Sequence, residues 1–299
     1  MLEKLLNLKF LKQHFKNKMM SQKIKISLFF NSLRGIKVMR HLMKIKSIDV
    51  SKIIISKKFL NKEIIKILRK KNIKFKYFEN YNKRQLNLEH KNIDIGILCG
   101  FPIILKENLL NKTKYGFLNC HAGILPNYRG GSPLNWQIIN NEKCFGITVL
   151  KTNFLIDNGN IILEKKFKLK NTHDINDLHE ISNNNFPILV ERSINKIIKG
   201  FLGKKQSSKG NKLFKQRNEK DSKINLKEIM YEKLLLMVRA LQNPYPNPFF
   251  FYKNKKMSIS NLHSSNKKLS PGEIIIKKNI LYIGCRNKTG MSYLKKYKS

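Results

Sequence analysis

The sequence predicts an α/β protein in which a doubly wound, mostly parallel sheet is followed by a small, mainly β C-terminal domain. From residue 23 onward, short apolar runs alternate with helical patterns, which is typical of parallel strands joined by crossover helices. Near the C-terminus, short strand-like runs replace that alternation. The 299 residues are enough for two modest domains, each with its own core.

The first five predicted strands are short runs rich in Ile, Leu and Phe, at 23–30, 50–56, 73–78, 92–101 and 114–123. Amphipathic patterns predict helices between the first three strands, at 32–44 and 61–71. In such a sheet, ligands bind beyond the carboxyl ends of the strands. The fourth run ends near Gly100 and the fifth near His121, so both lead to the predicted crevice.

The later elements complete the larger domain, which we place at 23–201. A helix with the only Trp is predicted at 132–142, and strand-like runs follow at 144–152 and 160–169. A tight polar loop at 153–160 lies between those strands. A long helical pattern at 173–198 ends the domain, with Asp174 as its expected N-cap.

The two ends of the chain are predicted to differ from this domain. Residues 1–22 form an N-terminal extension with a basic amphipathic pattern. A peripheral helix, a membrane contact and a true start at Met19 or Met20 all remain open for it. A breaker-rich linker is expected at 202–220 and a C-terminal domain at 221–299. That domain contains a predicted helix (224–241), a proline-rich turn (244–252) and short strands (271–294).

The net charge of +42 is the most conspicuous feature of the composition. A field of this sign attracts nucleic acids, nucleotides and anionic membranes. Only nine of the 61 basic residues are Arg, however, and the chain is crowded with Asn and Ile, as expected from AT-rich coding. Because specific phosphate or base contacts usually use Arg, a compositional bias is favoured over dedicated RNA binding.

The cysteines and the hydropathy exclude several classes of protein. The four Cys form no C-x-x-C pair and have no metal-ligand spacing, so we expect reduced thiols in a cytoplasmic protein without a metal site. No apolar run approaches the roughly 20 residues that a membrane span needs. We therefore expect no membrane span.

A candidate catalytic group lies at the end of the fifth strand. Alternation along a strand places Asn119 and His121 on one face and Cys120 on the other. A His beside an amide donor suits acyl transfer, because the imidazole accepts a proton from the nucleophile while the amide stabilises the oxyanion. Asp157, in the polar loop, is the candidate carboxylate that sets the protonation state of the His. By itself, N-x-H is more often structural than catalytic.

Several motifs agree with one family. In chain order, NCHAGILPNYRGG, SPLNWQIINNE, FGITV and LIDNGNI resemble the N10-formyltetrahydrofolate-dependent formyltransferases, over residues 90–165. That family includes enzymes acting on methionyl-tRNA, on glycinamide ribonucleotide and on sugar nucleotides. The resemblance implies a Rossmann-like catalytic domain and an amine acceptor for the formyl group.

The resemblance also implies roles for individual residues. Asn119 would stabilise the oxyanion, His121 would transfer protons, and Asp157 would orient His121. By position, the formyl-folate co-substrate would contact Gly123, Ile124, Leu125, Pro126, Asn153, Phe154, Leu155 and Ile156. No metal is implied.

The C-terminal segments narrow the choice of acceptor. DSKINL, MVRAL and PYPNPFFFY resemble the C-terminal β domain of the tRNA enzyme and of several sugar enzymes, with departures at Ser222, Leu226 and 247–248. The purine-pathway enzyme lacks that domain. RGGSPLNW is similar to the corresponding segment of 4-amino-4-deoxyarabinose nucleotide formyltransferases, which favours an amino-sugar nucleotide as acceptor.

Two alternatives remain open. The high Lys content and the basic linker suit methionyl-tRNA as the acceptor. The second alternative is a non-catalytic RNA-binding relative of the family. Its catalytic residues would be expected to be lost, whereas the chain retains Asn119, His121 and Asp157. Oligomeric state is not indicated, and a homodimer is one option. Candidate substrate contacts, each with a structural role as the competing interpretation, are Tyr128, Arg129 and Asn135.

Overall fold

The computed structural model describes residues 23–78, 92–207 and 212–294, so the predicted N-terminal extension (1–22) lies outside the described residues. The chain divides into two compact units. The first contains the described residues up to His121 together with 147–165 and 182–206, and the second contains 122–146, 166–181 and the residues from 207 onward. This division differs from the predicted boundary at 201 because helix α6 (Pro133–Ile139) packs with helix α8 (Tyr231–Ala240).

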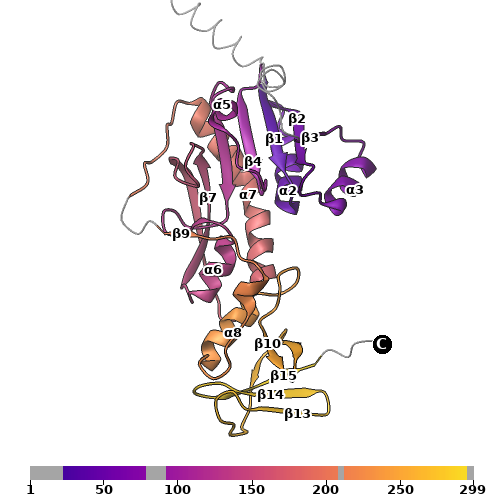
Figure 1. The fold of residues 1–299 in the computed structure, drawn as a ribbon. Helices are drawn as coiled ribbons and strands as arrows, with labels where there is room; N and C mark the ends of the chain where they lie inside the picture. The colour runs from indigo at the N-terminus through magenta and orange to yellow at the C-terminus, as the bar shows by residue number, and fades with distance from the viewer. Residues whose placement is uncertain (1–22, 79–91, 208–211, 295–299) are drawn as a thin grey trace, which may run out of the picture. The chain divides into compact units, whose positions relative to one another are not determined.

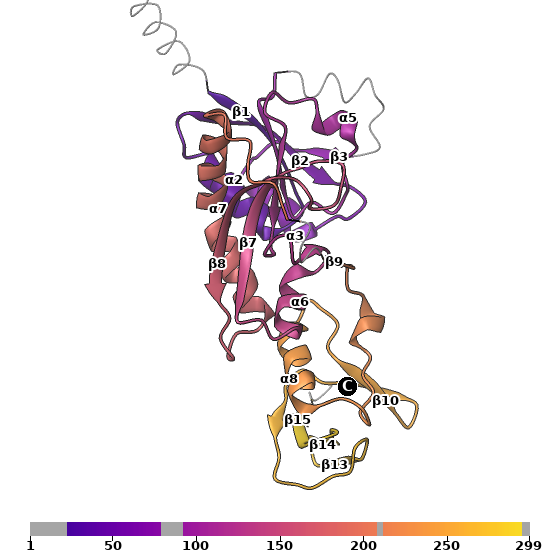
Figure 2. The same ribbon diagram turned by 90° about the vertical axis from the view of Figure 1, so that its left-hand side faces the viewer.

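A seven-stranded sheet has the order β3-β2-β1-β4-β5-β7-β8. Figures 1 and 2 show strands of this sheet from two directions. Its strands are β1 (Ile24–Phe30), β2 (Ile48–Ser56), β3 (Lys76–Phe78), β4 (Ile95–Cys99), β5 (Phe117–His121), β7 (Cys144–Lys151) and β8 (Ile161–Lys168). The first five strands are parallel to one another, and β7 is antiparallel to β5. The predicted doubly wound, mostly parallel sheet is confirmed.

Helices α2 (Leu33–Leu42) and α3 (Lys62–Lys70) follow the first two strands, as predicted. Helix α3 begins where the Asn61 side chain accepts hydrogen bonds from the backbone N–H groups of Glu63 and Ile64. The short helix α5 (Glu107–Leu110) packs against Phe29, Ile54 and Phe117 of the sheet. Helix α7 (Ile175–Ile198) has the expected cap, because the Asp174 carboxylate accepts from the N–H groups of residues 176 and 177.

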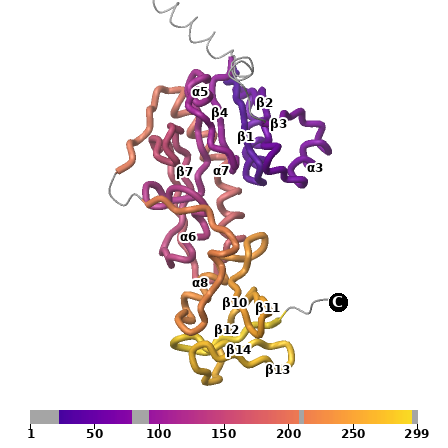
Figure 3. Tube along the Cα trace, viewed as in Figure 1, coloured from indigo at the N-terminus to yellow at the C-terminus, as the bar shows by residue number. Residues whose placement is uncertain are grey.

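The C-terminal part of the second unit is mainly β, as predicted, and Figure 3 traces it. Strands β10 (Phe249–Tyr252) and β11 (Lys255–Ser258) form a hairpin. A four-stranded sheet follows, ordered β12 (His263–Ser264), β15 (Thr289–Tyr293), β14 (Ile280–Gly284) and β13 (Ile274–Lys277). Leu234, Val238, Leu281 and Ile283 belong to one buried cluster that joins α8 to this sheet.

Two local predictions in this region are wrong. The helix predicted over 224–241 begins only at Tyr231, because the Asn225 side chain accepts from the Lys227 N–H and favours a turn. The turn predicted over 244–252 ends before Phe249, since the apolar residues that follow form strand β10. A 3-10 turn, η1 (Glu219–Ser222), closes the predicted linker.

Among the described ranges, no helix is both long and apolar enough to cross a membrane.

Candidate active site

Asn119 and His121 lie on β5, an interior strand of the sheet. Asn119 is opposite Leu98 of β4 and Leu150 of β7, and His121 is opposite Thr148. Pairing on both sides fixes the backbone of β5, and the period of two places both side chains on one face, as predicted. His121 is buried, with 6% of its side chain exposed.

Asp157 joins these two residues. The Asn119 amide donates to Asp157 Oδ1 over 2.9 Å, and His121 Nδ1 lies 3.3 Å from Asp157 Oδ2. Only 11% of the Asp157 side chain is exposed. The three side chains that the sequence selects therefore meet around one buried carboxylate.

The loop that carries Asp157 has an unusual backbone. Asp157 has a φ of +47°, in the left-handed region that non-glycine residues seldom adopt. At Gly159, an added Cβ would lie 1.6 Å from the Lys151 carbonyl oxygen, so only glycine fits. At the start of the loop, the Thr152 N–H and hydroxyl both donate to the Phe117 carbonyl of β5.

Gln206 holds the same loop from outside it. Its side-chain amide donates to the carbonyl oxygens of Asp157, over 2.8 Å, and of Gly159, over 2.7 Å. The sequence gives no signal for this contact, because Gln206 lies in the predicted linker and 49 positions away along the chain from Asp157.

Arg34, at the first turn of α2, is a second group that the sequence interpretation misses. Its Nη1 donates to the Cys120 carbonyl over 3.2 Å, between the two candidate catalytic residues, and its guanidinium lies 4.5 Å from the ring centre of Phe186 on α7. The pairing of β4 with β5 ends at Leu98 and Asn119. Arg34 therefore supplies the donor for the carbonyl of Cys120, the next residue of β5.

The opposite face of β5 carries a pair of thiols. Cys99 and Cys120 are buried, and their sulfur atoms lie 3.1 Å apart. Burial, together with the hydrogen bond to Cys120, raises the pKa of the Cys99 thiol well above its usual range. A neutral buried thiol is a poor nucleophile, so Cys99 belongs to the packing behind the site.

The geometry suits a proton transfer next to a developing negative charge. With its Nδ1–H directed at Asp157, a neutral imidazole has Nε2 as its basic nitrogen. The Asn119 amide has two N–H groups, of which one is bonded to Asp157. A nucleophile that lies against Nε2 would lose its proton to His121, and the buried carboxylate would stabilise the imidazolium.

The residues expected to contact the folate fall into two groups. In the first unit, Phe154, Leu155 and Ile156 expose 68%, 49% and 46% of their surface just before Asp157. Consecutive exposed apolar side chains suit an aromatic ligand. Asn153 has a local role, because its side chain accepts from the Leu155 N–H. In the second unit, residues 123–126 follow β5 directly, with Leu125 buried.

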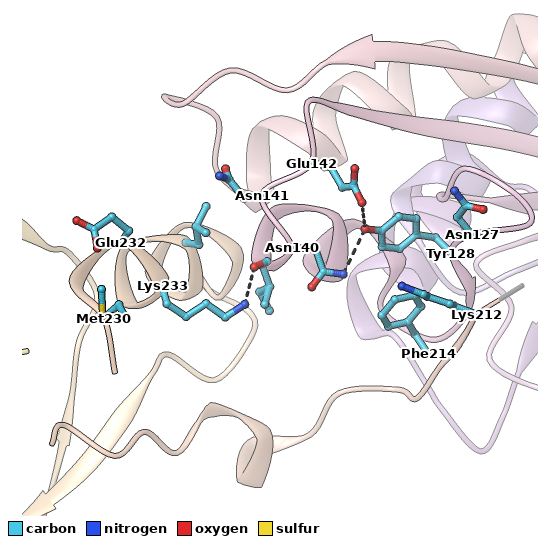
Figure 4. A pocket seen from close by; sticks show the side chains of 12 residues that line it. Asn127, Tyr128, Asn140, Asn141, Glu142, Lys212, Phe214, Met230, Glu232 and Lys233 are labelled. Atoms are coloured by element: carbon cyan, nitrogen blue, oxygen red, sulfur yellow. Dashed lines mark hydrogen bonds between the residues drawn. The ribbon is translucent and has the colours of Figure 1, made fainter. Parts of the chain in front are cut away.

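Tyr128 lies at the wall of a pocket of about 820 Å³ in the second unit, shown in Figure 4. Its hydroxyl donates to Glu142 over 2.5 Å and accepts from the Asn140 amide. Burial and the bond to Glu142 raise the pKa of Tyr128, so it stays protonated. Its ring stacks on Phe214 of β9 (Leu213–Phe214), which pairs with β6 (Arg129–Gly130).

The other two candidate substrate residues are buried. Arg129 exposes 6% of its surface and Asn135 exposes 1%. The Asn135 amide donates to the Ala240 carbonyl of α8 over 2.8 Å. Arg239 donates to the carbonyls of residues 173 and 170.

Comparison with known families agrees with this geometry. The family described as "Formyl transferase" matches residues 48–191, and "Formyl transferase, C-terminal domain" matches residues 218–292. The chain belongs to the formyl transferase family. The resemblance stated from the sequence is thereby confirmed for both parts of the chain.

The chain is similar to individual proteins of different names. Over 200 residues the chain is 34% identical to a methionyl-tRNA formyltransferase of Clostridium beijerinckii, a match that covers 64% of this chain and 63% of that protein. It is 28% identical over 236 residues to the bifunctional polymyxin resistance protein ArnA of Wigglesworthia glossinidia brevipalpis, covering 74% of this chain and 35% of the relative. The chain thus spans a little under two thirds of the length of the first relative.

Solved structures share the fold. A 4-N formyltransferase from Francisella tularensis superposes with a TM-score of 0.68 at 20% identity, covering 79% of this chain and 96% of the other. At this identity the similarity shows a common fold and carries no information about the substrate.

Proposed function

We propose that this formyl transferase family member transfers the formyl group of N10-formyltetrahydrofolate to a primary amine, using Asn119, His121 and Asp157. The single observation that carries the proposal is the Asp157 carboxylate, 11% exposed, which lies against both the Asn119 amide and His121 Nδ1. Such an arrangement supplies a proton acceptor and an oxyanion donor at neighbouring positions.

The proposed reaction begins with attack of the amine nitrogen on the formyl carbon. His121 Nε2 accepts the proton that the amine loses, while an Asn119 N–H donates to the oxygen that becomes negative. Collapse of the tetrahedral intermediate breaks the bond from carbon to the folate N10, which receives a proton from His121. The products are the formylated amine and tetrahydrofolate. The exposed apolar side chains at 154–156 would support the folate ring.

As acceptor we propose methionyl-tRNA. The sequence analysis instead favours an amino-sugar nucleotide over methionyl-tRNA. The relative with 34% identity is a methionyl-tRNA formyltransferase, and a chain of charge +42 would attract an RNA phosphate backbone. The sequence favours an amino-sugar nucleotide because of Pro133-Leu134-Asn135-Trp136.

That segment has a packing explanation in the structure. Leu134 is buried, Asn135 donates to α8, and the Trp136 indole N–H donates to the Lys215 carbonyl over 3.2 Å. Arg217 lies over the Trp136 ring at 4.7 Å. Because these contacts account for the residues, they no longer favour a sugar acceptor.

An amino-sugar nucleotide is the second candidate. The C-terminal motifs support it, because they resemble those of several sugar enzymes as well as those of the tRNA enzyme. A non-catalytic RNA-binding protein is less well supported, since the geometry around Asp157 is complete.

A paired assay with N10-formyltetrahydrofolate as donor tests the proposal. One reaction contains methionyl-tRNA, and the other contains 3-amino and 4-amino sugar nucleotides, with tetrahydrofolate release as the readout. We expect release with the charged tRNA, at a rate that uncharged tRNA does not support. Release with a sugar nucleotide alone would replace the acceptor, and no release with any amine would overturn the proposal.

A further inference from the structure

We infer that Gln206 is a positioning residue for Asp157: its two amide hydrogens fix the loop that presents this carboxylate to His121. The amide nitrogen lies 2.8 Å from the Asp157 carbonyl and 2.7 Å from the Gly159 carbonyl. These two carbonyls flank Asn158, so one side chain spans the turn. The inference rests on the proposed formyl transfer.

The loop needs such an anchor. Asp157 has a left-handed backbone conformation, which residues with a Cβ seldom adopt. Phe154, Leu155 and Ile156, which precede it, are exposed and do not pack it into the core. A strained turn persists when surrounding contacts determine it, and here Gln206 holds the carbonyl of the left-handed residue itself and the carbonyl two positions further on.

The segment that carries Gln206 is itself fixed to the sheet. Ile161, at the start of β8, and Lys204 exchange two backbone hydrogen bonds, each of 2.8 Å. The Asn160 amide also donates to the Leu202 carbonyl over 3.0 Å. Gln206 therefore lies two positions after a residue that is bridged to the start of β8. Residues 202–206 belong to the first unit, whereas the sequence predicts a linker there.

Only a side chain of this length with two donors reproduces both bonds. Glutamate has the same shape but, when ionised, offers only acceptors to two carbonyl oxygens, whereas methionine offers no donor. Protonated glutamate regains one O–H donor. This difference separates an effect of the hydrogen bonds from an effect of side-chain volume.

The test compares Gln206→Glu and Gln206→Met with the unchanged protein. We expect kcat to fall about ten- to hundredfold in both, as for a small displacement of a catalytic group, with the melting temperature close to that of the unchanged protein. Two facing carbonyl oxygens disfavour an ionised carboxylate and should raise the pKa of the new Glu side chain above its usual value of about 4.3. Relative to the unchanged protein at each pH, Gln206→Glu should therefore recover activity as the pH falls from about 8 to about 5, and Gln206→Met should not. Gln216→Glu, at an exposed position, makes the same change of charge and should leave kcat unchanged.

A measurement on His121 keeps the test independent of catalysis. In protein labelled with ¹⁵N-histidine, the Nδ1–H signal of His121 should shift or broaden in both Gln206 variants but not in Gln216→Glu. Normal kcat and an unchanged His121 signal in both variants would overturn the inference. If the unchanged protein formylates no acceptor, the proposed function fails, and the His121 signal alone then decides whether Gln206 positions Asp157.

Discussion

At the scale of single residues, the Asp157 carboxylate is the centre of the site. One oxygen accepts from Asn119 and the other faces His121 Nδ1, so the same group orients the amide and the imidazole. The position of the carboxylate in turn depends on a left-handed backbone, on Gly159 and on Gln206. Substitutions at these positions should therefore affect catalysis more than stability.

We expect His121→Ala to lower the rate of tetrahydrofolate release about 10²- to 10⁴-fold, because the proton acceptor is lost while the strand pairing of β5 is retained. The release rate is measured at saturating acceptor, and circular dichroism checks the fold. His263→Ala, at an exposed position of β12, is the control and should retain full activity. Substantial activity in His121→Ala would contradict the mechanism.

A matched pair of glycines tests the loop. In Gly159→Ala the new Cβ would overlap the Lys151 carbonyl, so the Asp157 loop must move, and we expect at least about a tenfold loss of kcat. Gly200→Ala has open space around the new methyl group. Its free energy of unfolding should fall by only about 1 kcal/mol, because alanine is disfavoured at the φ of +86°. Rates and unfolding curves of the two variants are compared. Equal kcat values would show that the close approach at Gly159 is unimportant for catalysis.

At the scale of elements, helix α6 is held to helix α8 and to the segment around β9. Asn135 donates to Ala240, Lys233 donates to the Ile139 carbonyl over 2.7 Å, and Arg217 packs on Trp136. Burial lowers the pKa of Lys233, and the charge of Arg217 lowers it further. Asn135 and Trp136 thus make contacts that hold α6 in place.

Asn135→Ala should lower the free energy of unfolding by about 1–3 kcal/mol, because the buried Ala240 carbonyl loses its donor. The KM for the acceptor should not change. Chemical denaturation measures the first quantity and steady-state kinetics the second. Asn195→Ala, on the exposed side of α7, should change neither. A raised KM with normal stability would return Asn135 to the substrate site.

The turn η1 offers a test by pH. A hydrogen bond from Lys215, followed by one from the Asn218 backbone, lowers the pKa of Asp221. A carboxyl with a lowered folded-state pKa stabilises the fold above its unfolded-state pKa of about 3.9, and that contribution is lost as the pH falls through the folded value. Asp221→Asn should therefore melt at a lower temperature than the unchanged protein at pH about 7, with the difference vanishing at strongly acidic pH. Glu228→Gln, for which no side-chain hydrogen bond lies nearby in the described chain, should show no such difference at either pH.

At the scale of the whole molecule, the charge of +42 bears on the choice of acceptor. Binding of RNA to basic residues releases counterions, so its affinity falls steeply with salt. Binding of a small nucleotide involves fewer phosphates and falls less. The salt dependence thus separates a functional charge from a compositional one.

Between about 50 and about 200 mM salt, we expect the KM for methionyl-tRNA to rise at least about tenfold, while the Kd for the folate changes far less. Steady-state kinetics and ligand titration give the two constants. A KM for charged tRNA that is independent of salt would favour the compositional explanation.

The sequence by itself determined the class of fold and the choice of candidate catalytic residues. Strand periodicity placed Asn119 and His121 on one face, and the alternation of apolar runs with helical patterns indicated the parallel sheet. These features are local along the chain or repeat along it, so they can be recognised from the order of the amino acids alone. The start of α8 and the position of β10 could not be predicted in this way. A turn closed by the Asn225 side chain replaces the first part of the predicted helix, and burial of the apolar residues from Phe249 onward replaces the end of the predicted turn with a strand.

Only the tertiary structure decided how the site is held together. Arg34 reaches a carbonyl 86 positions away, Gln206 reaches a loop 49 positions away, and Asn135 reaches α8 over 105 positions. Each contact joins a side chain to a backbone carbonyl. Every residue has such a carbonyl, so nothing in the identity of the accepting residue marks the partner. Folding alone brings donor and carbonyl together, and that is why the meeting of Asn119 and His121 on one face was predictable whereas the contacts that support them were not.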